Sequence, residues 1–168
     1  MKYRGFRLNL WALTVLILIF GVMLPPSPTF AAKQWGWPLQ PAKLSFGFDR
    51  PAQNWLPGHR GVDLEGRAGD RVLAAGNGVV TFAGLVAGKG VVVIRHGELR
   101  TTYEPVSASV ITGTRVRVGD LIGKLSPGQS HCSTQTSVNC LHWGLIRGEQ
   151  YLNPLLLVKK RVRLLPKS

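Results

Sequence analysis

The sequence predicts an all-β domain whose core is an antiparallel β-sheet, arranged as a sandwich or a barrel. From residue 71 onward, short apolar runs rich in β-branched residues alternate with glycine-bearing turns, which is typical of many short strands. Before that region, residues 33–57 are rich in proline and tryptophan and cannot form a long helix. At 168 residues, the chain has room for one domain plus an N-terminal targeting segment.

Residues 1–32 have the pattern of an export segment. A basic start is followed by the mostly apolar run 8–24, two prolines, and small residues suited to cleavage after Ala31. The apolar run is near the lower limit of membrane-spanning length, so an N-terminal membrane anchor is the alternative to a cleaved signal peptide. Both interpretations export the domain, either as a secreted protein or to the extracytoplasmic cell envelope.

The chain is strongly basic, with a formal net charge of +13. Removing the three basic residues of the export segment lowers this charge by three, from +13 to +10. A charge this high favours an anionic partner. Outside the membrane, we expect peptidoglycan or an anionic cell-wall polymer rather than nucleic acid. The basic tail, residues 158–168, is either a solvated terminus or a second contact with anionic polymer or lipid.

Residues 33–57 form an N-terminal extension that contains Trp35, Trp37 and Trp55. We expect these tryptophans to pack on the domain; the alternative is that they form an aromatic wall beside the substrate groove. Residues 44–48 alternate between apolar and polar and predict a short strand.

The strands that follow are predicted in order. Residues 72–75 end at Gly76-Asn77-Gly78, a tight-turn sequence, so 79–83 is expected to return as the second strand of a hairpin. A glycine-bearing loop is expected over 84–90, before a strand at 91–94 that is buried on both faces. The remaining strands are predicted at 99–103, 115–118, 121–125 and 141–147.

The alternation of the last strand predicts which side chains share a face. If His142 faces a groove, Cys140 and Gly144 face it too, while Leu141, Trp143 and Leu145 face the core. The apolar set therefore falls on one side.

His59, Asp63 and His142 are candidate metal ligands in a chain that has only four histidines. In an extended strand, His59 and Asp63 would lie ~13 Å apart, so a bend at Gly61 is needed to bring their heads together. Zinc held by three protein ligands keeps an open position for water. The alternative is a surface histidine beside a solvated aspartate.

Six motifs occur in order along the chain: Gly58-His59-Arg60-Gly61-Val62-Asp63-Leu64, Ala74-Ala75-Gly76-Asn77-Gly78-Val79-Val80, Val93-Ile94-Arg95-His96-Gly97, Thr102-Tyr103, Val118-Gly119-Asp120-Leu121-Ile122-Gly123 and Leu141-His142-Trp143-Gly144. This ordered series resembles the lysostaphin-type, or LytM-like, zinc endopeptidases of bacterial cell walls. The resemblance implies a peptidase domain over 58–157 with an antiparallel β core of the duplicated hybrid motif type and a groove over one sheet. It also implies one zinc ion on His59, Asp63 and His142, and peptide bridges of peptidoglycan as the substrate.

The chain departs from this family at two positions. The family has a histidine two residues after the tyrosine of its Thr-x-Tyr strand, where this chain has Pro105, and the family's closing His-x-His reads Cys140-Leu141-His142 here. The ligand positions match, but both non-ligand histidines are absent. Three interpretations follow: a zinc endopeptidase with atypical catalytic residues, a non-catalytic relative that binds the wall or regulates another wall hydrolase, and a secreted β domain with no wall role.

Two residues are candidates for the missing general base. Export and an even cysteine count favour a Cys132–Cys140 disulfide, although two thiolates binding zinc beside His142 is the alternative. The disulfide would hold His131 near Cys140, which makes His131 the first candidate. Glu104 is the weaker candidate, because alternation points it to the other face unless a bulge at Pro105 redirects it.

Overall fold

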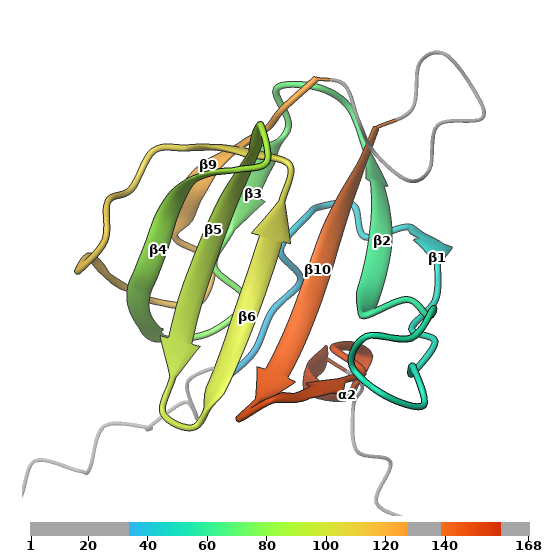
Figure 1. Cartoon of the computed structure of the whole chain (residues 1–168). Helices are drawn as coiled ribbons and strands as arrows, with labels where there is room; N and C mark the ends of the chain where they lie inside the picture. Colours follow the sequence, from blue (N-terminus) through green and yellow to red (C-terminus); the bar gives the residue numbers. More distant parts are fainter. Residues whose placement is uncertain (1–33, 128–138, 159–168) are drawn as a thin grey trace, which may run out of the picture. The chain divides into compact units, whose positions relative to one another are not determined.

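The computed structural model describes residues 34–127 and 139–158 (Figure 1). These residues form two antiparallel sheets, so the all-β prediction is confirmed. A four-residue helix, α2 (Leu155–Val158), follows the last strand. In the described part of the chain, no helix is long and apolar enough to cross a membrane.

The larger sheet has eight strands among the described residues, in the order β1-β2-β10-β6-β5-β4-β8, with β11 paired to β10. In that order, the strands are β1 (Leu44–Phe46), β2 (Gly61–Gly66), β10 (Asn139–Arg147), β6 (Leu99–Glu104), β5 (Lys89–His96), β4 (Gly78–Val86), β8 (Arg115–Val116) and β11 (Gln150–Leu152). The described residues of the smaller sheet form β3 (Arg71–Leu73), β9 (Leu121–Leu125) and β7 (Val106–Ala108). The pairing of β2 with β10 joins segments that are far apart in the sequence (Figure 1).

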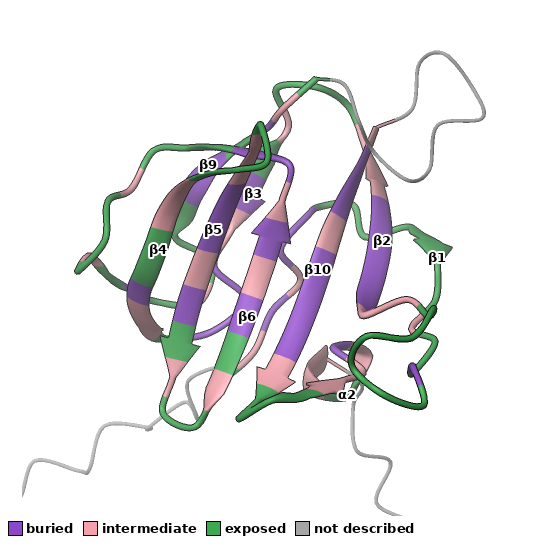
Figure 2. Cartoon of the chain, viewed as in Figure 1, coloured by how far each residue is buried: buried purple, intermediate pink, exposed green. Residues whose placement is uncertain are grey.

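The hydrophobic core contains residues from both sheets. Large buried side chains come from β2, β5, β6 and β10 of the larger sheet and from β3 and β9 of the smaller one (Figure 2). Leu141, Trp143 and Leu145 are at most 2 % exposed, so the core face predicted for the last strand is confirmed. The opposite face of β10, which carries His142, is therefore the face turned away from this core.

The N-terminal extension packs on the domain through part of its length. Trp35 makes an edge contact with His96 at 4.9 Å between ring centroids, and Trp37 lies 6.1 Å from Trp143. Leu39 is fully buried. The packing expected for the tryptophans is confirmed for Trp35 and Trp37 but is wrong for Trp55, whose side chain is 79 % exposed.

The hairpin predicted around Gly76-Asn77-Gly78 is wrong. β3 pairs with β9 in the smaller sheet, whereas β4 pairs with β5 and β8 in the larger one, so the turn connects two sheets. Long-range bonds hold it there: the Asn77 side chain accepts the amide of Val118 at 2.8 Å, and the Asn77 carbonyl accepts Nδ1–H of His96 at 2.7 Å. The turn itself is present, but the bonds to Val118 and His96 determine that the next strand joins the other sheet.

Two further boundaries differ from the prediction. The expected loop over 84–90 is a tight hairpin, because β4 and β5 continue until only Ala87 and Gly88 separate them, both at positive φ. An alanine at positive φ is uncommon, so this turn has little local signal in the residue types. The strand predicted at 115–118 is limited to Arg115–Val116, which pairs with β4.

Candidate metal centre

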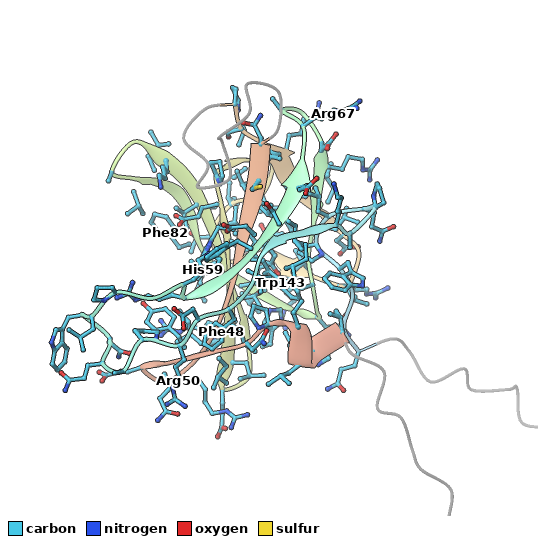
Figure 3. All side chains as sticks on the ribbon, turned by 90° about the vertical axis from the view of Figure 1, so that its right-hand side faces the viewer. Phe48, Arg50, His59, Arg67, Phe82 and Trp143 are labelled. Atoms are coloured by element: carbon cyan, nitrogen blue, oxygen red, sulfur yellow. The ribbon has the colours of Figure 1, made fainter. Side chains whose placement is uncertain are left out.

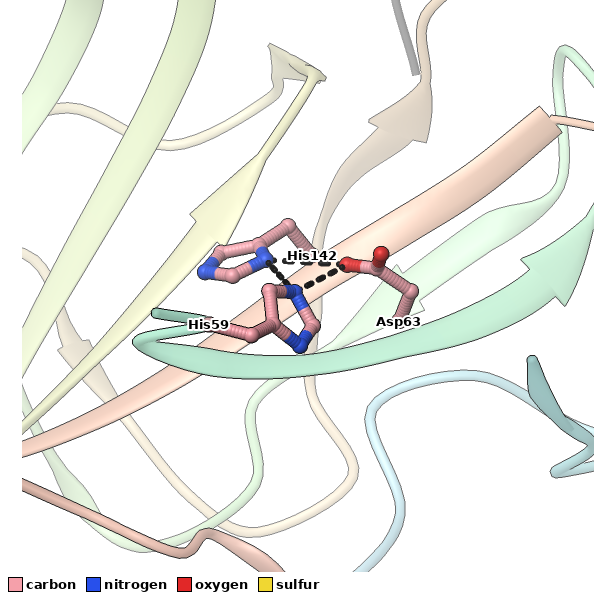
Figure 4. A group of neighbouring side chains, drawn as sticks. All are labelled: His59, Asp63 and His142. Carbon is pink, nitrogen blue, oxygen red and sulfur yellow. Dashed lines mark hydrogen bonds and ion pairs between the residues drawn. The ribbon is translucent and has the colours of Figure 1, made fainter. Parts of the chain in front are cut away.

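Three predicted side chains converge on the outer face of the larger sheet. His142 and Asp63 are directly opposite in the β10–β2 ladder, and His59 lies two residues before β2. Nε2 of His59 is 3.2 Å from Oδ1 of Asp63 and 3.1 Å from Nδ1 of His142, and that Nδ1 is 2.9 Å from the same carboxylate oxygen (Figure 4). Each residue thus offers one donor atom, and the three atoms lie within 4.8 Å of one another.

Gly61 allows this convergence. The chain bends at Arg60, and β2 begins at Gly61. A Cβ atom at Gly61 would lie 2.5 Å from the Trp143 carbonyl oxygen and 2.6 Å from Nε2 of His142. Because real Cβ atoms essentially never approach that closely, the ring of His142 occupies space that only a glycine leaves open.

The ring of His59 is oriented by a backbone acceptor. Its Nδ1–H donates to the carbonyl oxygen of Gly47 at 2.6 Å, which leaves the lone pair on Nε2 directed toward Asp63 and His142. An edge contact with Phe46, at 4.9 Å between ring centroids, supports the same ring. Such outer hydrogen bonds fix the tautomer of metal-binding histidines. The role of the Gly47 carbonyl could not be predicted from residue types, because every residue has a backbone carbonyl.

The donor set fits a divalent metal ion. Asp63 is 1 % exposed, and a buried carboxylate is unfavourable unless cationic or hydrogen-bonding groups surround it. Two imidazole nitrogens and one carboxylate oxygen are the donors found in catalytic zinc sites with three protein ligands.

The β6–β10 register corrects the prediction for Glu104. Glu104 is directly opposite His142, so its side chain lies on the same face of the sheet as the donor cluster. The expectation that it points to the other face is wrong, because it assumed that the groove-facing position was Pro105. In the structure β6 ends at Glu104, and the chain passes through Pro105 into β7 of the other sheet.

The other predicted residues are only partly described. Cys140 lies in β10 opposite Glu65, buried, on the face that carries His142. His131 and Cys132 lie outside the described residues, so the disulfide and the role of His131 stay predictions. Mass spectrometry of unreduced, digested protein would show the linked pair, and two free thiols would contradict it.

A row of register partners beside the donor cluster begins with two glycines. Gly61, Gly144 and Thr102 are register partners across β2, β10 and β6, and the row continues through Val93 and Phe82. Figure 3 shows His59 and Phe82 on one side of the sheet and Trp143 on the other. Both glycines are buried, because the His142 ring occupies the space beside Gly61 and the Thr102 hydroxyl occupies the space beside Gly144.

His96, for which no chemistry was predicted, belongs to a separate hydrogen-bond chain. The amide of Ala75 donates to the Tyr103 hydroxyl (3.0 Å), which bonds Thr101 Oγ1 (2.8 Å), which bonds Nε2 of His96 (2.8 Å). Since Nδ1–H of His96 donates to a carbonyl, Nε2 accepts, and the hydroxyl groups must donate toward it. Burial raises the pKa of Tyr103 to about 12 and lowers the pKa of His96 from its ordinary value. This hydrogen-bond chain stabilises the fold, and it includes none of the three donor residues.

An antiparallel sheet with a His–Asp–His cluster on one face has the donor set of a metal-binding protein. The model of peptidase family M23 matches residues 57–154, which is more than half of the chain, and the chain belongs to this family. The family prediction made from the motifs is therefore confirmed.

Uncharacterized proteins of Mycobacterium tuberculosis and Mycobacterium bovis are 45 % identical to this chain over 163 residues. The match covers 92 % of this chain and 64 % of each relative, so the chain spans less than two thirds of the length of these relatives.

Three solved structures share the fold. Csd3 of Helicobacter pylori has 27 % identity and a TM-score of 0.60, covering 76 % of this chain and 35 % of that one. Lysostaphin has 21 % identity and a TM-score of 0.62, covering 82 % of this chain and 61 % of that one. A zinc-containing peptidase from Vibrio cholerae has 18 % identity and a TM-score of 0.59, covering 77 % of this chain and 41 % of that one.

Proposed function

We propose that this protein is an exported zinc endopeptidase that cleaves peptide bridges of peptidoglycan. The observation that carries the proposal is the convergence of His59, Asp63 and His142 on an open sheet face, with Glu104 opposite His142. Membership of peptidase family M23 supports a peptidase activity. The similar Vibrio cholerae protein is described as a zinc-containing peptidase, which supports zinc as the metal.

The chain's own residues would hold the ion through Nε2 of His59, Nδ1 of His142 and Oδ1 of Asp63. Zinc, when bound, supplies Lewis-acid chemistry that polarises a carbonyl group and lowers the pKa of water. Gly47 keeps the His59 ring in the tautomer that such binding requires.

Glu104 is the described residue best placed to move the proton. As a carboxylate it accepts a proton from water, and as a carboxylic acid it returns that proton to the leaving amine. A general base of this kind contributes about 10²- to 10⁴-fold to the rate. Glu104 would thus perform the proton transfer for which the resembled family has histidines at the positions of Pro105 and Cys140. His131 is the second candidate, and the two are separated by substitution.

Export and charge support a wall substrate. The export pattern of residues 1–32, with membrane attachment through 8–24 as the alternative, would deliver the domain outside the cytoplasm. A net charge of +13 in the whole chain favours association with anionic wall polymers.

One observation favours a second function. This chain has Pro105 and Cys140 where the resembled family has its non-ligand histidines. A proline side chain cannot transfer protons, and neither can a cysteine in the predicted disulfide. A non-catalytic domain that binds wall peptides or regulates another wall hydrolase is therefore the alternative function.

A release assay distinguishes the two functions. Purified protein with zinc should release new amino groups from peptidoglycan, and His59→Ala should abolish both the release and zinc binding. Ile111→Ala is the control, because it removes an exposed side chain that is not part of the donor cluster. Absence of release by a zinc-loaded wild-type protein that still sediments with walls would support the alternative.

A further inference from the structure

Trp55 is an exposed tryptophan that belongs neither to the hydrophobic core nor to the donor cluster. Its side chain is 79 % exposed, and it lies in the loop between Asp49 and His59. The backbones of Asp49 and His59 bond each other in both directions, at 3.0 and 2.8 Å. The loop therefore closes on a residue of the donor cluster, and anything bound to the loop is held next to that cluster.

The loop is held in one position by side chains around it. Arg60 donates to the carbonyl oxygens of Asn54 and Leu56, the latter at 3.0 Å, and its guanidinium lies 5.6 Å above the centre of the Tyr151 ring. The Asn54 side chain donates to the carbonyl of Glu149 at 2.8 Å. A loop fixed in advance loses little conformational entropy when it binds a ligand.

A cavity of about 270 Å³ lies between this loop and the start of β11. Its lining includes two aromatic side chains, three amide side chains and one arginine, namely Trp55, Tyr151, Gln53, Asn54, Gln150 and Arg50. An indole ring offers a flat apolar surface, while amides both donate and accept hydrogen bonds. A sugar ring has the matching chemistry, since it has an apolar C–H face and a rim of hydroxyl and acetamido groups.

The cavity and the donor cluster share a face of the larger sheet. Tyr151 is opposite Ile146 in the β10–β11 ladder, and Ile146 follows His142 by four residues, so the three side chains lie on one side. The separation along the strand is ~13 Å, the span of about four residues of extended peptide. Gly144 lies midway, and the Thr102 hydroxyl occupies the space beside it.

We infer that this cavity binds an amino-sugar ring of the substrate, so that the enzyme recognises a short peptide together with the glycan to which it is attached. The inference rests on the proposed wall substrate and deepens it. It places the scissile bond about four residues from the sugar, as judged from the ~13 Å path.

The direct test is binding of a soluble trimer of β-1,4-linked N-acetylglucosamine to the purified zinc-loaded chain, measured by calorimetry. Trp55→Ala should weaken this binding ~5-fold or more, the effect of losing one aromatic stacking partner. Ile111→Ala, which removes an equally exposed apolar side chain (76 %), should bind as the wild type does. Equal affinity of Trp55→Ala and wild type, or no binding by the wild type at millimolar trimer, would overturn the inference.

A second readout links the cavity to catalysis. The ratio of kcat/KM for a peptide with an N-terminal lactyl-amino-sugar to kcat/KM for the same peptide without it should fall ~5-fold in Trp55→Ala, while the sugar-free peptide is cleaved as before. Cleavage with no such preference overturns the sugar site and leaves the proposed peptidase. Trp55-dependent trimer binding without any cleavage supports the sugar site and contradicts the peptidase.

Discussion

Gly61→Ala tests the geometry of the donor cluster directly. The added Cβ atom would lie 2.6 Å from Nε2 of His142, roughly 0.8 Å inside ordinary contact, and 2.5 Å from the Trp143 carbonyl oxygen. The β2–β10 ladder fixes both backbones, so the ring of His142 has to move. We expect a loss of about 1–3 kcal/mol in the free energy of unfolding, the usual effect of overpacking.

The larger effect should be on the metal. Displacing one of three donors by close to 1 Å should weaken zinc binding by at least ~10-fold, comparable with the loss of an outer-sphere partner. Zinc affinity would be measured by competition with a chromogenic chelator, and stability by calorimetry. Ile111→Ala, which removes an exposed side chain outside the donor cluster, should match the wild type in both. Wild-type zinc affinity in Gly61→Ala would refute the assignment of His142 as a ligand at this position.

Three further predictions concern the base and the buried hydrogen-bond chain. Glu104→Gln should lower kcat ~10²-fold or more while zinc stays bound. If Glu104→Gln keeps nearly the wild-type kcat and His131→Ala shows a loss of that size instead, His131 is the general base. Tyr103→Phe should destabilise the fold by roughly 2–4 kcal/mol in chemical denaturation, because it leaves the Ala75 amide and the Thr101 hydroxyl without their buried partner; an unchanged midpoint would contradict this. The pKa of His96 is lowered on folding, so below pH 6.5 the unfolded chain binds a proton that the folded chain does not, and stability should fall as the pH drops below 6.5. That slope should be smaller in His96→Gln, and an identical slope in both proteins would exclude His96 as its source.

The fold class and the core face of the last strand could be predicted because they depend on local pattern. Alternation places Leu141 and Trp143 on one side and His142 on the other in any register, so the split survives whatever the partner strand is. The meeting of His59, Asp63 and His142 was also predicted, although from motif spacing and resemblance.

What could not be predicted depends on where strands end and which sheet they join. Glu104 was assigned to the wrong face because the strand was assumed to continue through Pro105, whereas the chain leaves for the other sheet at that residue. The Gly76-Asn77-Gly78 turn was read as a hairpin because its sequence suits one, but bonds from Val118 and His96 hold it between sheets. Such partners are distant in sequence and carry no local signal.

The hydrogen bond from His59 to the Gly47 carbonyl sets the smallest fragment that can work. The family match begins at residue 57, and the predicted domain boundary at 58, yet the acceptor that orients the His59 ring comes from a segment upstream of both. The same upstream segment supplies Leu39 to the core and Trp37 to the ring of Trp143. A recombinant fragment trimmed to the family match would therefore keep all three donors and lose the contact that orients His59, so a fragment made to bind zinc should begin no later than Trp37.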